Sequence, residues 1–96
     1  METIKLKFNG SLTSLCGNPF GRAVFTEQVE SALKEKSIVT VLIPDNIDTV
    51  SMSFVQGFLS SLAEKYGMNN VSEHLIVCSA HSRVNRKFNE AMSMRV

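Results

Sequence analysis

The sequence predicts an α/β fold, because strand-type and helix-type patterns alternate along the chain in the order β-α-β-α-β-α. Such alternation is typical of largely parallel sheets whose crossover helices pack on the sheet. The chain has 96 residues, enough for one domain with one small core. Hydrophobic residues make up 44% and charged residues 20%, which is a globular composition rather than a disordered one. We therefore expect residues 1–96 to form a single domain.

Three segments have the pattern of strands. Residues 3–8 alternate between apolar and lysine side chains, as in a half-exposed strand. Residues 38–43 are a continuous apolar, β-branched run, typical of a central strand that is covered on both faces. Residues 74–79 form the third strand. We expect a fourth strand within residues 11–16, paired with the first as a hairpin around an Asn-Gly turn.

Helical periodicity predicts three helices, over about 22–36, 52–66 and 82–94. Ser51 is placed to cap the second helix, and Gly67 stops it. The inner face of the last helix carries Val84, Phe88, Ala91 and Met92. The expected architecture is thus a mixed, largely parallel sheet of about four strands with three helices packed on it.

Charge is nearly balanced over the chain but uneven along it. Ten Lys and Arg stand against nine Asp and Glu, a net charge of +1, so no global field favours nucleic acid or an anionic membrane. The bases concentrate in the last 16 residues, where one acid accompanies Arg83, Arg86, Lys87 and Arg95. A basic last helix is usually a solvated face whose charges favour the helix C-terminus. The alternative is a helix that binds nucleic acid or another anion through these four residues.

The two cysteines, Cys16 and Cys78, are too few and too widely spaced for a disulfide scaffold. Cys78 falls inside an apolar run, where a thiol behaves as a small hydrophobic group. The N-terminus lacks a signal-peptide pattern, and no apolar run is long enough to span a bilayer. We therefore expect a cytoplasmic protein without membrane association.

Residues with catalytic or metal-binding chemistry are few. His74 and His81 flank a predicted strand without the spacing of a metal site. Asp45 and Asp48 share one loop, which suits a turn better than acid–base catalysis. Arg22 follows a Gly-rich loop into a helix, where free N–H groups hold anions in some proteins, although a simple turn and capped helix explains the pattern. The sequence predicts no enzyme, no metal and no cofactor.

The segment 44–58 carries the most informative geometry. It places Ser51 and Ser53 where the central strand gives way to the second helix, and ligands of open α/β sheets gather at such strand ends. A phosphoryl group on Ser53 would add about −1.5 to −2 charges there, beside Asp45 and Asp48. The simpler interpretation is that Ser51 caps the helix and Ser53 follows in its first turn.

Four pieces of the chain, GNPFGR, IVTVLI, PDNIDTVSMSF and FVQGFLSSLAEKYG, together resemble the STAS-like domains of unknown function. These are small bacterial and phage-borne relatives of the STAS fold of anti-sigma-factor antagonists and sulfate transporters. The resemblance covers roughly residues 10–93, and its most specific parts are Gly21-Arg22 and the block 38–58. It implies a sheet of about four strands with helices on one side, and a role in regulation through protein–protein contacts.

In the anti-sigma-factor antagonists, a partner kinase phosphorylates a serine at the start of the second helix. The resemblance puts Ser53 at that position, with Ser51 where those proteins have an aspartate and Phe54 where they have a glycine. STAS-like domains often accompany a histidine-kinase-type ATPase domain. We expect none to be attached here, so the expected partner, such an ATPase or another regulator, would come from another chain.

We therefore expect a non-enzymatic regulatory module, switched by phosphorylation of Ser53 or, as the second candidate, Ser51. The predicted partner-binding residues are Asp45, Asp48, Ser51, Ser53, Phe54 and Arg22. Two alternatives stay open: binding of nucleic acid or an anion through the basic last helix, and inhibition of a host complex by a small phage or mobile-element protein. The oligomeric state is also open, because the edges of a thin sheet invite pairing that Lys5 and Lys7 would oppose.

Overall fold

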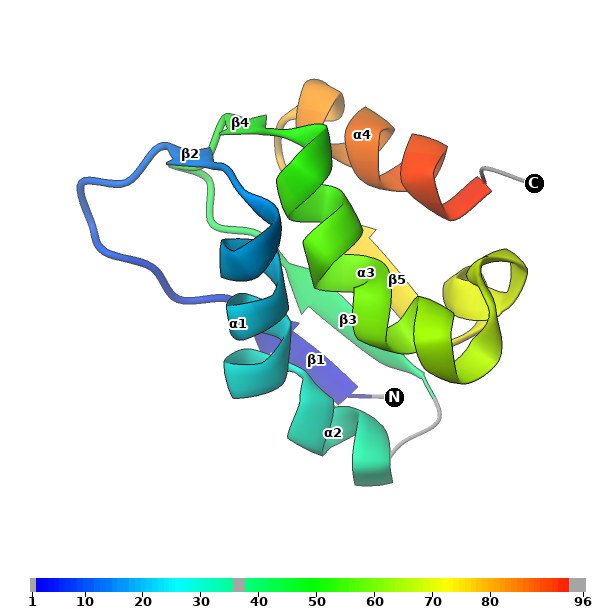
Figure 1. The fold of residues 1–96 in the computed structure, drawn as a ribbon. Coiled ribbons are helices and arrows are strands. Elements are labelled where there is room, and N and C mark those ends of the chain that lie inside the picture. The colour runs from blue at the N-terminus through cyan, green and yellow to red at the C-terminus, as the bar shows by residue number, and fades with distance from the viewer. Residues whose placement is uncertain (1, 36–37, 94–96) are drawn as a thin grey trace.

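The computed structural model describes residues 2–35 and 38–93 of the chain (Figure 1). Along this described part, the elements in order are β1 (Glu2–Lys5), β2 (Ser14–Leu15), α1 (Asn18–Gln28), α2 (Glu30–Glu35), β3 (Val39–Leu42), β4 (Thr49–Val50), α3 (Met52–Tyr66), the 3-10 helix η1 (Met68–Glu73), β5 (Leu75–Cys78) and α4 (Ser82–Ser93).

The main sheet is parallel and has the strand order β1-β3-β5, so β3 is its central strand. The register places Ile4 beside Val41 and Val41 beside Val77. Residues that are paired in register point to the same face of a sheet. A second, two-stranded parallel pair joins Leu15 of β2 to Val50 of β4. In Figure 1 this pair lies beyond the ends of the main strands, near the start of α3.

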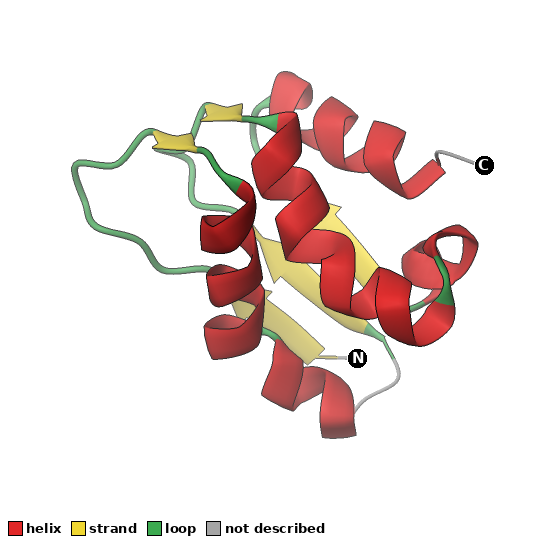
Figure 2. Cartoon of the chain, in the orientation of Figure 1, coloured by secondary structure: helices red, strands yellow, loops and turns green. Residues whose placement is uncertain are grey.

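The helices of the described chain lie on one side of the main sheet (Figure 2). One core cluster joins them to the sheet, and Phe58 of α3 is at its centre. The Phe58 ring lies 5.6 Å from the ring of Phe25, 6.0 Å from that of Phe54 and 5.7 Å from that of Phe88, measured between centroids. Helices α1, α3 and α4 therefore share one aromatic cluster above the sheet.

Helices α1 and α3 cross at two glycines with no side chain between their backbones. A Cβ atom added to Gly21 would lie 2.7 Å from the Phe58 nitrogen and overlap the Phe54 carbonyl oxygen. One added to Gly57 would lie 2.8 Å from the Asn18 carbonyl carbon and overlap its oxygen. Real Cβ atoms do not approach backbone this closely, so the crossing requires glycine at both positions.

None of the helices in the described part of the chain covers the opposite side of the main sheet. Along β5, Leu75 and Val77 are buried, while Ile76 is 41% exposed and the Cys78 thiol is also exposed. Along β3, buried residues alternate in the same way with half-buried ones. We call this side the open face; its members, taken from the strand register, are Thr3, Lys5, Thr40, Leu42, Ile76 and Cys78. The other side is called the covered face.

The structure confirms an α/β fold with parallel strands and corrects the expected sheet. The fourth strand does not form a hairpin with β1: residues 14 and 15 pair in parallel with β4. This pairing places Leu15 and Val50 in the core, where both are almost fully buried. Residues 38–43 were expected to be covered on both faces, but the described helices cover only one. Cys78 is exposed for the same reason, because it points to the open face.

The expected first helix is two helices and begins earlier. α1 starts at Asn18, with Pro19 in its first turn, where the missing N–H and fixed φ of proline are favourable. It ends at Gln28, and the backbone N–H of the capping residue Val29 donates to the Phe25 carbonyl oxygen before α2 begins. The bounds of α3 and the start of α4 agree with the predicted helices, while the predicted end of the last helix at about Met94 lies outside the described residues. The four predicted inner residues of α4 are buried.

Candidate functional site

The loop after β1 and the loop after β3 meet at the carboxyl end of the main sheet. The Asp48 N–H donates to the Thr13 carbonyl oxygen at 3.0 Å. The Asn46 side-chain amide donates to the Leu12 carbonyl oxygen at 2.8 Å. These bonds span more than 30 residues of sequence and hold Asp48, which is itself exposed, at the strand end.

The loop after β5 joins the same region. His81, just before α4, lies with its Nε2 atom 2.7 Å from the Asp45 carbonyl oxygen. In this hydrogen bond the ring nitrogen is the donor, because a carbonyl oxygen only accepts. The Asp45 carboxylate is exposed beside it. All three strand-end loops are thus tied together, and Asp45 and Asp48 lie on the surface that they form.

Ser51 caps α3 and also holds the start of α1. Its Oγ atom accepts from the Phe54 N–H at 3.1 Å and from the Gly17 N–H at 3.3 Å. It lies 3.0 Å from the Ser53 Oγ atom. Because two N–H groups occupy the acceptor sites of Ser51, its own hydroxyl proton is the one that points to Ser53. Ser51 is half-buried, and its hydroxyl is committed to structure.

Ser53 is exposed in the first turn of α3. Its Oγ atom accepts from Ser51 and has no other bond among the described residues. Backbone N–H groups in the first turn of a helix have no partner within the helix, and the helix dipole favours negative charge there by about 0.3–1 kcal/mol. The hydroxyl of Ser53 is therefore accessible, in a place that tolerates an added anion.

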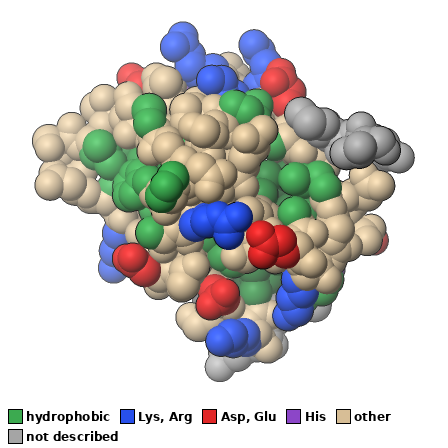
Figure 3. All heavy atoms as spheres, viewed as in Figure 1, with side chains coloured by type: hydrophobic (Ala, Val, Ile, Leu, Met, Phe, Trp, Pro, Cys, Tyr) green, Lys and Arg blue, Asp and Glu red, His purple; other side chains and the backbone are tan. Residues whose placement is uncertain are grey.

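The Lys87 side chain of α4 reaches the start of α3. Its Nζ atom donates to the Val50 carbonyl oxygen at 3.0 Å, one residue before the helix cap. Arg83 and Arg86 are exposed on α4, and Figure 3 shows Lys and Arg side chains gathered over the start of this helix, at the top of the view. Arg95, the fourth predicted base, lies outside the described residues. Lys87 of the basic helix thus adjoins the start of α3.

Two of the predicted partner-binding residues are not on this surface. The Phe54 side chain is fully buried and packs between Phe20 and Phe58, so it has no area to offer a partner. Arg22 is exposed but forms an ion pair with Glu64 at 3.4 Å. Glu64 lies eleven residues after Ser53 on α3, about 16 Å along the helix axis. The structure brings together Asp45, Asp48, Ser51 and Ser53, which we call the strand-end surface.

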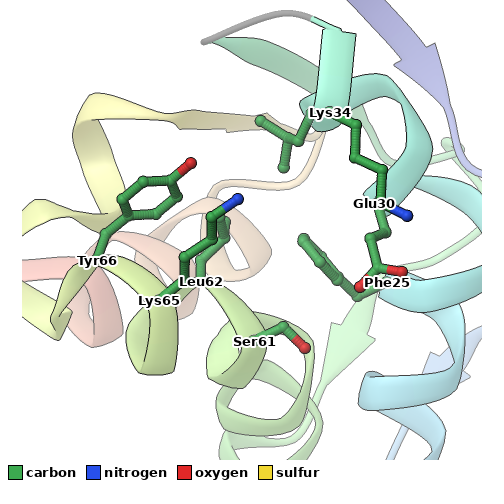
Figure 4. Close-up of a pocket in the computed structure, with 8 residues that line it drawn as sticks. Phe25, Glu30, Lys34, Ser61, Leu62, Lys65 and Tyr66 are labelled. Carbon is green, nitrogen blue, oxygen red and sulfur yellow. The ribbon is translucent and has the colours of Figure 1, made fainter.

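A small cleft lies elsewhere, between α2 and the second half of α3 (Figure 4). Its volume is about 110 Å³. Phe25 and Leu62 form its apolar part, and Glu30, Lys34 and Lys65 carry charges at its edge. Its described lining residues include no histidine or cysteine, and they lie far along α3 from Ser51 and Ser53. This cleft adds nothing to the strand-end surface.

Within residues 2–35 and 38–93, no group of three or more His, Cys, Asp or Glu side chains is placed to hold a metal ion. None of the helices in this part of the chain combines the length and the hydropathy that crossing a membrane requires.

No family model, no curated protein and no solved structure matches the chain. The resemblance to STAS-like domains therefore stays a prediction.

Sequence patterns did not indicate the bonds that organise this surface. The contact between Gly17 and Ser51 joins residues 34 apart, and that between Lys87 and Val50 joins residues 37 apart. A local pattern carries no information on such pairs. The cap at Ser51 was predictable, because a serine before an apolar helical stripe is a local signal.

Proposed function

We propose that the protein is a non-enzymatic regulatory module that binds another protein through the strand-end surface, and that phosphorylation of Ser53 switches this binding. One observation carries the proposal: the two neighbouring hydroxyls have different tasks. Ser51 accepts two backbone N–H groups and is half-buried, whereas Ser53 is exposed. Only the second can change its chemistry without loss of the cap.

A phosphate on Ser53 would alter the surface while leaving the fold intact. The modified residue keeps its Oγ atom, so the bond from the Ser51 hydroxyl can persist. The added charge of about −1.5 to −2 would lie at the start of α3, where the helix dipole favours it. Asp45 and Asp48 are exposed on the same surface, so a partner that recognises it would meet a much more negative patch.

The architecture is in keeping with the resemblance to STAS-like domains, which implies helices on one side of the sheet. We include membership of that family in the proposal. The partner would be a histidine-kinase-like ATPase or another regulator on a separate chain. The segment SMSF differs from the acidic–Ser–Ser–Gly context of the anti-sigma-factor antagonists, so the kinase would need a different recognition sequence.

The test is affinity purification of the tagged protein from its source cell, followed by intact-mass measurement. We expect a co-purified protein and a fraction of the chain carrying one phosphoryl group at Ser53. The variant Ser53→Asp should change recovery of this partner at least tenfold relative to Ser53→Ala. The matched control is Ser31→Asp, an exposed serine in the first turn of α2, which should behave as wild type.

Two results would count against the proposal. One is a partner whose recovery is the same for Ser53→Asp and Ser53→Ala. The other is binding of nucleic acid that falls steeply with salt and is lost in Arg83→Ala and Arg86→Ala, which would favour the basic helix as the functional element.

A further inference from the structure

The open face is unusual for a parallel sheet. All-parallel sheets occur almost only where both faces are covered, and here the described helices cover one. The open face exposes Ile76 and Cys78 on the edge strand β5, with half-buried Leu42 beside them on β3. A parallel sheet with apolar side chains on an uncovered face has room for a further layer.

Side-chain amides close the two outer edges of the same sheet just past the ends of β1 and β5. At the β1 edge, the Gln28 side-chain amide accepts from the Lys7 N–H at 2.8 Å and donates to the Lys7 carbonyl oxygen at 2.9 Å. At the β5 edge, Asn85 makes the same pair of bonds with Ser79, both at 2.8 Å. Each carboxamide takes the place of a peptide group from a neighbouring strand. Added strands are therefore disfavoured just past the ends of β1 and β5.

A groove continues the open face past the carboxyl ends of β1 and β3. Its volume is about 680 Å³, within the range of sites that hold ligands or side chains of a partner. Lys5, Lys7, Leu42 and Pro44 contribute to its lining, and Asp45 is also part of the lining. Apolar side chains thus lie between two lysines on one side and the exposed β5 strand on the other.

Positive charge borders the apolar part of the open face. Lys5 belongs to this face, and Lys7 lines the adjoining groove together with Asp45. Both lysines are exposed, and neither forms an ion pair with another described residue. Positive charge beside an apolar surface matches a partner with acidic residues beside its own apolar stripe.

We propose that the open face binds one amphipathic helix of a partner protein, whose apolar stripe packs on Leu42 and Ile76 and whose acidic side chains face Lys5 and Lys7. Three strands of four residues form a face about 13 Å long and 14 Å wide, which one helix of about 10 Å diameter covers. This layer would complete the arrangement that parallel sheets normally have.

A second copy of the chain fits the face poorly. A symmetric dimer would bring the same lysines, Lys5 and Lys7, of the two copies together. The inference does not depend on the proposed function, because the residues that carry it (Lys5, Lys7, Leu42 and Ile76) are not residues of the strand-end surface, although Asp45 of that surface also lines the groove.

The test is selection from a displayed library of random 20-residue peptides against the full chain. We expect enrichment of peptides with apolar residues at helical spacing and Asp or Glu beside them. Synthetic copies of these peptides should bind the variant Lys5→Glu/Lys7→Glu at least tenfold more weakly, and Ile76→Lys likewise. The matched control is Lys34→Glu/Lys65→Glu, which makes the same charge change at exposed lysines outside the open face and should bind as wild type. Circular dichroism verifies that each variant is folded.

Three outcomes would overturn the inference. The selected peptides could lack acidic residues or helical spacing. Their binding could be insensitive to all open-face variants, including the case in which no peptide is enriched. Sedimentation could instead show dimers of the wild type that Ile76→Lys dissociates, which would assign the face to a second copy. The variant Ser53→Asp should leave peptide binding unchanged, so the two proposals fail separately.

Discussion

The two faces of the main sheet differ in what their residues are required to do. On the covered face, Phe58 contacts three other aromatic rings, and glycines bring two helix backbones into contact. On the open face, alternate residues of the same strands are exposed or half-buried. The same strands thus contribute to the core on one side and to a surface on the other. Substitutions should therefore have very different effects on the two faces.

The largest effect is expected at the centre of the aromatic cluster. Phe58→Ala removes a fully buried ring with three ring neighbours, and such truncations cost about 3–5 kcal/mol. For a small domain this is a large part of the free energy of unfolding, which is about 5–15 kcal/mol. Urea unfolding measures the loss. A loss below about 1 kcal/mol would show that Phe58 is not at the centre of the core.

The next effect is expected at the crossing of α1 and α3. Gly57→Ala places a methyl group against the backbone of Asn18, and overpacking of this kind costs about 1–3 kcal/mol. The control is Gly10→Ala, where an added Cβ meets nothing within 4 Å. Thermal unfolding of the two variants compares the positions directly. Equal midpoints would contradict the close crossing.

A smaller effect is expected at the cap of α3. Ser51→Ala removes the acceptor of the Phe54 and Gly17 N–H groups, and loss of an N-cap costs about 0.5–2 kcal/mol. Ser53→Ala removes an exposed hydroxyl and should change the free energy of unfolding by less than about 0.5 kcal/mol. Urea titration of both variants distinguishes the structural serine from the accessible one. The reverse order would exchange their proposed roles.

The smallest effect is expected on the open face. Ile76→Thr keeps a β-branched residue on β5 and should change the free energy of unfolding by no more than about 0.5 kcal/mol. Val77→Thr, its neighbour on the covered face, places a hydroxyl among buried apolar groups and should cost more than 1 kcal/mol, as do buried polar groups of about this size. Similar losses at both positions would mean that both faces of β5 are packed.

Sequence patterns predicted the elements whose signals are local. The order of strands and helices, the cap at Ser51, the end of α3 at Gly67 and the inner face of α4 all follow from periodicity and capping residues. Asn18 and Pro19 also carried a local signal for the start of α1, because proline is favoured in the first helical turn. When these two residues are interpreted as part of the preceding loop, the predicted helix starts at Arg22, four residues later than α1 does.

The remaining features depend on which segments meet, and no local pattern encodes that. A run such as residues 38–43 predicts burial on both faces, but β-branched residues also suit a strand with one open face, since they pack well on any pleated surface. The sequence predicts Phe54 to be available to a partner, whereas its side chain is fully buried against the rings of Phe20 and Phe58. The parallel pair of β2 and β4 joins segments about 35 residues apart, beyond the reach of a hairpin signal.

The most direct measurement compares thiol accessibility on neighbouring residues of β5. In a Cys16→Ser background, the Cys78 thiol should react with a small maleimide in the folded protein about as fast as in urea, because it lies on the open face. A second protein, with Cys16→Ser, Cys78→Ser and Val77→Cys, should be protected until it unfolds, because position 77 points into the core. If Cys78 is protected as strongly as position 77, the sheet is covered on both sides and the open face does not exist.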